Sequence, residues 1–256
     1  FEDVDEPYED DYKRVIPEKC QWVVVMSLQM SRETLRRAPM VTGAQATMGA
    51  YSRMDYLVGA TAEFIRGLGY VAIPSVNDTA AIIPFAIQAG LGELARTNRL
   101  VTPEYGPVVR LCKIFTDLPL ATDKPIEFGV WEFCKKCMKC AEACPPKALS
   151  FDPEPSFNTR GPWNNPGHQG WFEDSVKCYT YWQAGPGTNC TICFAVCPFS
   201  KPKGILHSFV KTSIAKAPML DKLFIVGDDI IGYGKQKDPE EWWNLDLDEY
   251  GIDGAH

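Results

Sequence analysis

Eight cysteines between Cys134 and Cys197 are the residues of this sequence best suited to chemistry. The first four follow the spacing C-x2-C-x2-C-x3-C-P, which is typical of bacterial iron–sulfur proteins in which the fourth cysteine binds the other cluster. The second run, C-x2-C-x3-C-P, is one cysteine short, and Cys178 stands twelve positions before Cys190. Cys178 is the expected replacement, which gives eight ligands for two 4Fe–4S clusters.

The rule of crossed ligands divides the eight cysteines into two sets. One cluster would take Cys134, Cys137, Cys140 and Cys197. The other would take Cys144, Cys178, Cys190 and Cys193. Zinc and disulfides are the alternatives, but zinc usually takes two C-x2-C pairs and seldom a doubled C-P pattern. Disulfide-rich secreted proteins spread their cysteines through a small scaffold, whereas these eight fall within 64 residues.

Length and charge narrow the function classes. The chain has 256 residues, enough for one large domain or two modest ones. Its net charge of −7 argues against a nucleic-acid partner. No apolar run approaches the roughly 20 residues that span a bilayer, and no signal peptide is visible. The chain begins at Phe1 and not at Met, so we interpret it as a processed or truncated form.

The pattern of apolar residues predicts alternating strands and helices before the cysteines. Strands are expected over residues 21–28, 70–74 and 107–116, where β-branched and aromatic residues gather. A helix is expected from about Ala50 to Leu68, with Gly69 ending it. These elements indicate an α/β layer.

Several shorter features complete the prediction. Ser31 is expected to cap a helix, and residues 77–79 form a polar loop at the end of a strand, where ligands often bind. Residues 80–94 predict one or two short helices. The irregular insert over residues 151–182 is long enough that we expect it to line a site. A final strand is expected over residues 220–226, and Cys20 and Cys112 are expected to be core thiols.

Tyr51 at the head of a helix, Asn77 after the next strand and Arg110 in the third, followed by the two cysteine runs, resemble the respiratory reductive dehalogenases. The resemblance extends from Trp22 over nearly the whole chain. It implies a corrinoid enzyme with two 4Fe–4S clusters that replaces the halogen of a small halogenated hydrocarbon with hydrogen. The implied fold is α+β, with a nitroreductase-like corrinoid-binding α/β layer and a ferredoxin-like two-cluster module.

The resemblance also implies a division into domains. Residues 1–125 would form part of the corrinoid- and substrate-binding domain, and residues 126–210 the cluster module. Residues 211–256 would pack back on the core and end in an acidic tail. Family members are considerably longer, so we expect an N-terminal segment over the corrinoid and substrate to be missing here.

Residue chemistry agrees with the roles that the resemblance implies. A phenol such as Tyr51 can donate a proton to a carbanion-like centre. Arg110 in an apolar strand requires a polar or anionic partner, and near Tyr51 it would stabilise the phenolate. The alternatives are a solvent-facing helix-end tyrosine, a structural ion pair for Arg110 and a loop cap for Asn77.

The sequence gives a weaker signal for the residues that contact the corrinoid. Its expected contacts lie in the insert, at Trp163, Asn164, His168 and Trp171. No histidine stands in a D-x-H-x-x-G loop, so the cobalt is expected to have no histidine ligand from the protein; the three are His168, His207 and His256. Nucleotide-binding motifs such as G-x-G-x-x-G are also missing from the sequence.

The resemblance implies partners and a location. They are an upstream electron donor, a small membrane-anchor protein and a possible second copy of the chain, at the outer face of the cytoplasmic membrane after twin-arginine export. Two other functions remain open. An epoxyqueuosine reductase shares the corrinoid and the clusters but acts on tRNA, which the acidic balance opposes. A two-cluster electron carrier would have no need of the residues before Cys134.

Overall fold

The computed structural model describes residues 1–200, 221–232 and 234–246, and the chain divides into two compact units. The first unit comprises Phe1–Leu28, Gly49–Leu91 and Arg110–Pro125, and the second comprises Gln29–Met48, Gly92–Val109 and Ile126–His256. The limit at residue 125 coincides with the predicted one. The division differs in that residues 29–48 and 92–109 belong to the second unit, because they pack with the cysteine-bearing helices. The predicted limit at residue 210 lies outside the described residues.

A three-stranded sheet with β7 (Val109–Thr116) in the middle organises the first unit. β3 (Trp22–Gln29) lies on one side of it and β4 (Ala72–Ser75) on the other. β4 and β7 run antiparallel, with Ser75 opposite Lys113. All three strands lie within two residues of the predicted ranges, because runs of Val, Ile and Phe favour extended backbone.

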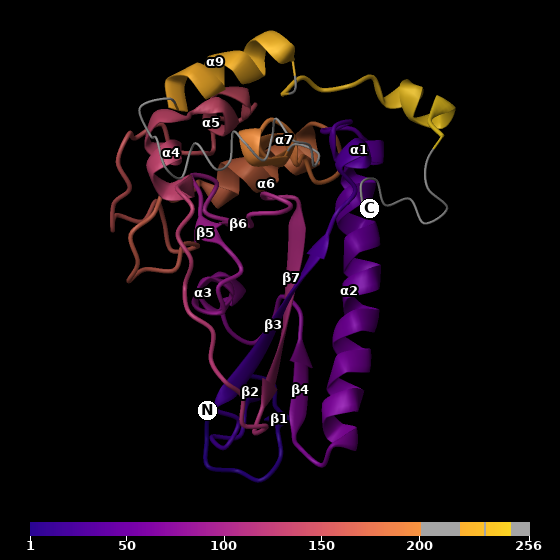
Figure 1. The fold of residues 1–256 in the computed structure, drawn as a ribbon, viewed down its shortest axis with the longest axis vertical. Helices are drawn as coiled ribbons and strands as arrows, with labels where there is room; N and C mark the ends of the chain where they lie inside the picture. Colours follow the sequence, from indigo (N-terminus) through magenta and orange to yellow (C-terminus); the bar gives the residue numbers. More distant parts are fainter. Residues whose placement is uncertain (201–220, 233, 247–256) are drawn as a thin grey trace. The chain divides into compact units, whose positions relative to one another are not determined.

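Helix α2 (Val41–Gly67) runs along one side of this sheet (Figure 1). Its buried residues recur at spacings of three or four, which places them on one stripe of the helix. In the first unit the stripe consists of Ala50, Met54, Val58, Ala62 and Ile65. The stripe packs against Cys112 and Ile114 of β7. Gly69, with a φ of 92°, follows the end of the helix as predicted.

The start of α2 differs from the prediction, because the helix begins at Val41 and not near Ala50. Gly43 weakens the helical pattern there, since glycine is a poor helix former. In the structure, a Cβ added to Gly43 would lie 2.5 Å from the backbone nitrogen of Ala38, so this close approach requires glycine. Tyr51 therefore lies inside the helix and not at its head.

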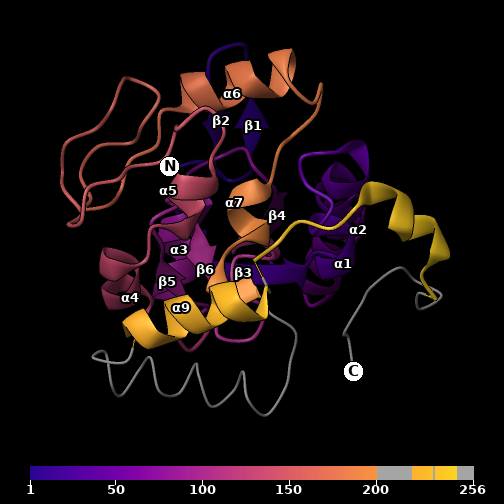
Figure 2. The same ribbon diagram turned by 90° about the horizontal axis from the view of Figure 1, so that it is seen from above.

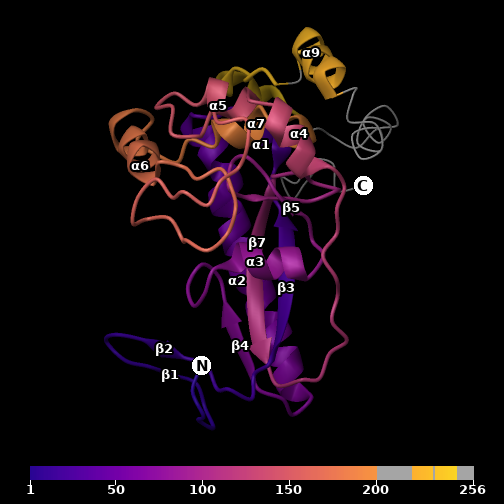
Figure 3. The same ribbon diagram turned by 90° about the vertical axis from the view of Figure 1, so that its left-hand side faces the viewer.

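The opposite face of the sheet packs against α3 (Ile82–Gln88), one of the short helices expected over residues 80–94. The rings of Phe85 and Phe115 meet edge to face with their centroids 5.8 Å apart. A small hairpin of β1 (Tyr8–Glu9) and β2 (Arg14–Val15) stands near the N-terminus (Figure 3). Both faces of the sheet are thus covered by apolar side chains.

Short helices joined by irregular segments make up the second unit. Its elements are α1 (Arg32–Leu35), β5 (Glu93–Leu94), β6 (Leu100–Val101), α4 (Val130–Lys136), α5 (Lys139–Ala143), α6 (Ser175–Ala184), α7 (Ile192–Ala195), η1 (Pro198–Ser200), α9 (Asp221–Ile231) and η3 (Pro239–Asn244). Figure 2 shows α7 beside α5 and α9 beside α4. The core of this unit gathers around Phe133, Trp171 and Phe199, each at most 2% exposed.

The predicted strand over residues 220–226 is wrong, because Asp221 to Ile231 form α9. A short apolar run does not by itself distinguish a strand from a helix. Residues seven positions apart lie on the same side of a helix, and two buried aspartates use this spacing. Asp221 pairs with Lys136 at 2.8 Å, and Asp228 pairs with Lys139 at 2.5 Å. These pairs hold α9 against α4 and α5. Residue 220 lies outside the described residues.

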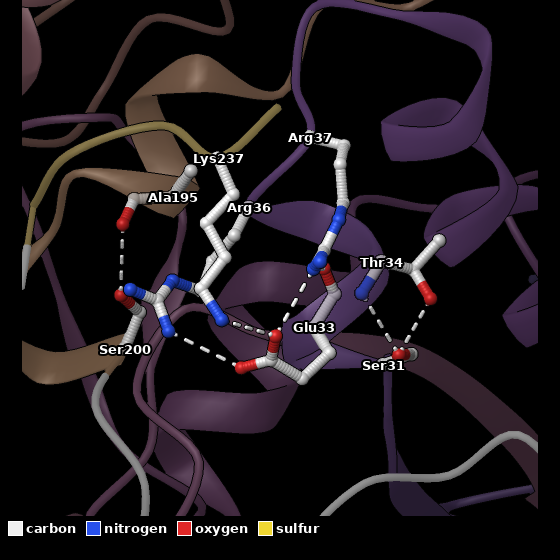
Figure 4. Close-up of polar contacts among 8 residues, drawn as sticks. All are labelled: Ser31, Glu33, Thr34, Arg36, Arg37, Ala195, Ser200 and Lys237. Carbon is white, nitrogen blue, oxygen red and sulfur yellow. Dashed lines mark hydrogen bonds and ion pairs between the residues drawn. The ribbon is translucent and has the colours of Figure 1, made fainter. Parts of the chain in front are cut away.

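A cluster of charges joins α1 to the segment before η3. Ser31 caps α1 as predicted, since its Oγ accepts a hydrogen bond from the Thr34 N–H at 3.2 Å. Three cations surround Glu33 (Figure 4). Its carboxylate pairs with Arg36 at 3.2 Å, Arg37 at 3.0 Å and Lys237 at 2.9 Å. Burial disfavours the carboxylate, but hydrogen bonds from Lys237 and Arg37 outweigh it and lower the pKa of Glu33 from 4.5 to about 2.

We expect Glu33→Gln to remove an acid-sensitive part of the stability. A carboxyl group whose pKa is depressed in the fold stabilises it above the unfolded pKa, and this contribution is lost as the pH falls from about 4.5 to about 2. It amounts to at most about 3.5 kcal/mol, at about 1.4 kcal/mol for each pKa unit. The thermal unfolding midpoint should fall more steeply over this range in the wild type than in the variant. Glu6→Gln, which removes an exposed carboxylate, is the control, and parallel curves for all three proteins would contradict the prediction.

Candidate active site and cluster module

Strand and helix geometry bring Tyr51 and Arg110 together in the first unit. Successive side chains of a strand point to opposite faces of the sheet, so Arg110 shares a face with Cys112, which α2 covers. Tyr51 precedes Met54 by three positions on α2, and this spacing keeps both on the side of the helix that faces β7. Both Tyr51 and Arg110 are partly buried.

Tyr51 contacts both of the other residues predicted for the active site. Asn77, in the loop after β4, donates a hydrogen bond from Nδ2 to the Tyr51 Oη at 2.7 Å. The central carbon of the Arg110 guanidinium lies 4.9 Å from the centroid of the Tyr51 ring, where a cation is attracted to the π electrons. The structure therefore brings all three residues into one group.

This arrangement suits the donation of a proton. Because the Tyr51 Oη accepts its hydrogen bond from Asn77, its own hydrogen can point to another acceptor. When that proton leaves, the Asn77 N–H and the Arg110 charge both stabilise the negative oxygen. This geometry does not agree with the alternative interpretation of Tyr51 as a tyrosine whose hydroxyl contacts only water.

The loop that carries Asn77 is fixed through Asp78. The carbonyl oxygen of Asp78 accepts hydrogen bonds from the Ser75 Oγ at 2.6 Å and from the buried Nζ of Lys113 at 2.8 Å. Its carboxylate pairs with Arg14. Burial opposes ionisation of this carboxyl, but hydrogen bonds from backbone N–H groups and Ser75, together with the charge of Arg14, lower the pKa of Asp78 overall. Asn77 is thus held in place by its neighbour.

In the second unit, one group of thiols surrounds Cys140. Burial raises the pKa of the Cys140 thiol well above its ordinary value, and its neighbours Cys134, Cys197, Cys193 and Cys137 raise it further by repelling the thiolate. Burial also raises the pKa of Cys134 to about 12 and of Cys137 to about 11, although nearby N–H groups and cations offset part of the effect. Three of these neighbours are the partners predicted for Cys140.

A second group contains the other four cysteines. Burial raises the pKa of Cys178 to about 11, with further contributions from Glu173, Cys144 and Cys190. Burial likewise raises the pKa of Cys193, whose neighbours include Cys190 and Cys178. These neighbours are the members of the second predicted set. Because Cys193 also neighbours Cys140, the two groups lie next to each other.

The thiols form no disulfides in the structure. All ten cysteines are free. Among the described residues, no three His, Cys, Asp or Glu side chains are placed to hold a single metal ion. Cys20 and Cys112, each 1% exposed, lie among apolar residues as predicted.

Arg96 lies between β5 and β6, has no exposed surface and was not predicted from the sequence. Its Nε and Nη2 donate to the Cys134 carbonyl at 3.1 and 2.6 Å, and Nε also donates to the Cys137 carbonyl at 3.0 Å. Its Nη1 donates to the carbonyls of Ser150 at 3.0 Å and Asp152 at 2.7 Å. One arginine in a polar turn gives no periodic signal, so the pattern of the sequence could not reveal it.

The residues predicted to contact a corrinoid lie in the insert. They are Trp163, Asn164, His168 and Trp171. The first two donate hydrogen bonds to the Glu173 carbonyl at 3.4 and 3.1 Å, and the ring of His168 lies 4.9 Å from that of Phe172. Trp171 is 1% exposed, and its place in the core explains its burial without a ligand. The corrinoid contacts stay a prediction.

Comparisons with known proteins cover both units. Residues 1–120 match the family described as the reductive dehalogenase subunit, and residues 133–200 match the 4Fe-4S double cluster binding domain. The tetrachloroethene reductive dehalogenase of Sulfurospirillum multivorans is 41% identical over 256 residues, which cover 100% of this chain and 51% of that protein. The corresponding enzyme of Desulfitobacterium hafniense is 36% identical over 237 residues, which cover 91% of this chain and 43% of that protein.

A solved structure gives the same answer for the fold. A catabolic reductive dehalogenase in complex with 3-bromo-4-hydroxybenzoic acid superimposes with a TM-score of 0.75 at 30% identity, covering 84% of this chain and 30% of that one. A shorter match, 30% identical over 132 residues, relates 48% of the chain to 34% of an epoxyqueuosine reductase of Lactococcus garvieae. The chain spans about half the length of the curated dehalogenases that it matches.

The sequence matches extend over the first unit and the cysteine-bearing part of the second, and the structural match covers most of the chain. They agree with the two groups of thiols, which form a module for two 4Fe–4S clusters. The chain therefore belongs to the reductive dehalogenase family.

Proposed function

We propose that this chain takes part in the reductive dehalogenation of a small organohalide. The observation that carries the proposal is the hydrogen bond from Asn77 to Tyr51 beside Arg110, in a chain that also carries two clusters. The net reaction takes an organohalide, two electrons and one proton to the hydrogenated product and a halide ion. The cluster module would supply the electrons, and the Tyr51 group would supply the proton.

A corrinoid, when bound, would supply the cobalt through which electrons reach the carbon–halogen bond. The proposal of this cofactor is supported by a similar solved protein whose description names B12-dependent dehalogenation. The residues present fit such chemistry, because a carbon that has lost halide and gained two electrons needs a proton, and Tyr51, which is itself partly buried, carries one. We assign Trp163, Asn164 and His168 as contacts of the corrinoid, and the first unit as its nitroreductase-like layer.

The proton step would proceed at the Tyr51 Oη. The O–H bond breaks, its electron pair stays on the oxygen, and a C–H bond forms from the electron pair that two-electron reduction leaves on the carbon as the halide departs. The Asn77 amide and the Arg110 guanidinium stabilise this phenolate, and solvent returns the proton after turnover. Arg110 acts here through a fixed charge that is already in place before the reaction.

We assign the two groups of cysteines as the ligands of the two clusters, with Cys197 completing the first set and Cys144 the second. Cys178 lies on α6, a helix in which no residue is buried, so its cluster would lie nearer the surface of the module. An upstream donor would deliver electrons to this cluster first. The electrons would then pass to the cluster around Cys140.

The remaining assignments rest on the family. They are a small halogenated hydrocarbon as substrate, a small membrane-anchor protein, a possible homodimer, and a peripheral place on the outer face of the cytoplasmic membrane after twin-arginine export. The relatives named tetrachloroethene reductive dehalogenases support the substrate class. Among the described helices, none is both long and apolar enough to cross a membrane.

The epoxyqueuosine reductase alternative has less support. Its sequence match covers about half of the chain, whereas the dehalogenase match covers all of it. The net charge of −7 also opposes binding of tRNA. A simple electron carrier leaves the Tyr51 group without a function. Halide release from a chloroalkene, set against reduction of epoxyqueuosine in tRNA, distinguishes the two enzymes.

Anaerobic reconstitution should give about eight irons per chain, because two four-iron clusters are expected. Cys178→Ala should lower this number, since it removes one ligand of the second cluster. Cys20→Ala removes a core thiol outside both groups and should leave the iron content unchanged. The measurement is colorimetric iron against protein. About four irons in the wild type, with no change in Cys178→Ala, would remove Cys178 and the second cluster from the proposal.

The cobalt should have no histidine ligand from the protein, because no D-x-H-x-x-G loop is present. His168 packs against Phe172, while His207 and His256 lie outside the described residues. Electron paramagnetic resonance of the cobalt(II) holoprotein should lack splitting by an axial nitrogen of the protein. His168→Ala and His207→Ala should leave the spectrum unchanged. Nitrogen splitting that disappears in either variant would overturn the expectation.

Tyr51→Phe should lower turnover of a chloroalkene by about 10²–10⁴-fold, the usual contribution of a positioned acid. The substitution removes the proton and retains the ring that packs against Arg110. Iron and corrinoid contents should remain those of the wild type. Halide release by the reconstituted holoprotein is the measurement.

Two further variants sharpen this test. Tyr56→Phe removes a hydroxyl from an 80% exposed tyrosine of the same helix and should have no effect. Arg110→Lys should also lower turnover, because an ammonium cannot reproduce the planar guanidinium over the ring. The double variant Tyr51→Phe/Arg110→Lys should be little worse than Tyr51→Phe alone, since both serve one step. Near-normal turnover by a fully loaded Tyr51→Phe protein would show that the proton comes from elsewhere.

A further inference from the structure

Arg96 places a complete positive charge inside the cluster module. The residue has no exposed surface, and its guanidinium carbon lies 4.8 Å from the centroid of the Trp171 ring. Trp171 is itself held, because its Nε1 donates a hydrogen bond to the Asp152 carbonyl at 2.9 Å. Stacking and hydrogen bonds together fix the plane of the guanidinium.

Within the described part of the chain, the hydrogen-bond acceptors around this guanidinium are neutral. They are the backbone carbonyls of Cys134, Cys137, Ser150 and Asp152. Among the residues that the structure describes, no carboxylate forms an ion pair with Arg96, whereas Arg99, three positions later, pairs with Glu173 at 2.6 Å. The carbonyls satisfy the donors of Arg96, but they do not neutralise its charge.

A buried positive charge destabilises the fold unless a negative group nearby compensates it. Burial of an ionised group without a counter-ion is strongly unfavourable. The group that would provide compensation here is a cluster with thiolate ligands, which carries a net negative charge. Arg96 lies beside its ligands, since it bonds the carbonyls of Cys134 and Cys137, and its backbone N–H donates to the Cys134 Sγ at 3.5 Å.

We propose that Arg96 is a positioning residue that raises the reduction potential of the cluster bound through Cys134 and Cys137. Reduction adds one electron from the upstream donor and makes the cluster one charge more negative. A fixed cation in a medium of low dielectric stabilises the more negative state more strongly, and net charge and hydrogen bonds to sulfur are established determinants of cluster potential. Arg96 therefore makes the buried cluster easier to reduce. This is the cluster toward which we have proposed that electrons flow.

The test separates the charge of Arg96 from its hydrogen bonds. Arg96→Gln keeps hydrogen-bond donors and removes the charge, whereas Arg96→Lys keeps the charge and removes the planar fork. Arg66→Gln, at a partly exposed arginine paired with Glu63, is the control. Each reconstituted protein is titrated with dithionite and followed by electron paramagnetic resonance, with iron counted in parallel.

In Arg96→Gln, one of the two clusters should become harder to reduce by at least tenfold in its reduction equilibrium, or about 59 mV for one electron. In Arg96→Lys the potential should stay near the wild-type value, even where less iron is bound. Loss of that cluster in Arg96→Gln but not in Arg96→Lys would also support the role of the charge. Wild-type potentials in Arg96→Gln, or loss of the cluster in both variants, would overturn it and leave only a structural role.

This inference rests on the proposed ligand sets of the two clusters, but its test is independent of the proposed reaction. The titration uses no organohalide and no corrinoid. A protein that binds both clusters and fails to release halide would refute the dehalogenase proposal and still report the potential. A wild-type potential in Arg96→Gln together with normal halide release would refute only the inference on Arg96.

Discussion

The packing of α2 against one face of β7 determines where the functional groups of the first unit lie. The alternation of side chains along β7 puts Arg110 on the same face as Cys112 and Ile114, and the stripe of α2 that covers this face continues to Tyr51. Asn77 then needs only the loop after β4 to reach the Tyr51 hydroxyl. The residues that we propose as the proton donor and its supporting charge thus lie at the end of an ordinary apolar contact between helix and sheet.

The cysteines could be predicted because their signal is local. Spacings of two and three residues are repeated in the sequence itself. In the structure Cys140 neighbours Cys134, Cys137 and Cys197 as well as Cys193, and Cys178 neighbours Cys144 and Cys190. The strands were found because their β-branched and aromatic residues fit the half-buried surface of a sheet. Tyr51, Asn77 and Arg110 came from family resemblance, and the antiparallel pairing of β4 and β7 explains in physical terms why residues so distant in sequence meet.

The parts that could not be predicted depend on contacts between distant segments. Gly43 reads as a helix breaker, but it permits α2 to approach the backbone of Ala38. The run that begins at Asp221 reads as a strand, but it is a helix held by lysines of α4 and α5. The acceptors of Arg96 are backbone carbonyls 38 to 56 residues further along the chain. Every residue has a backbone carbonyl, so no pattern of side chains in the sequence indicates which carbonyls accept hydrogen bonds from Arg96.

The raised pKa values of the cysteine thiols also affect their reactivity when no iron is bound. Oxidants and alkylating agents attack the thiolate, and a thiol with a pKa near 11 or 12 is almost fully protonated at neutral pH. Burial in the folded chain therefore disfavours the thiolate form that oxidants attack. That protection ends when iron arrives, since each ligand must release its proton to bind. Maturation of the module is accordingly coupled to proton release.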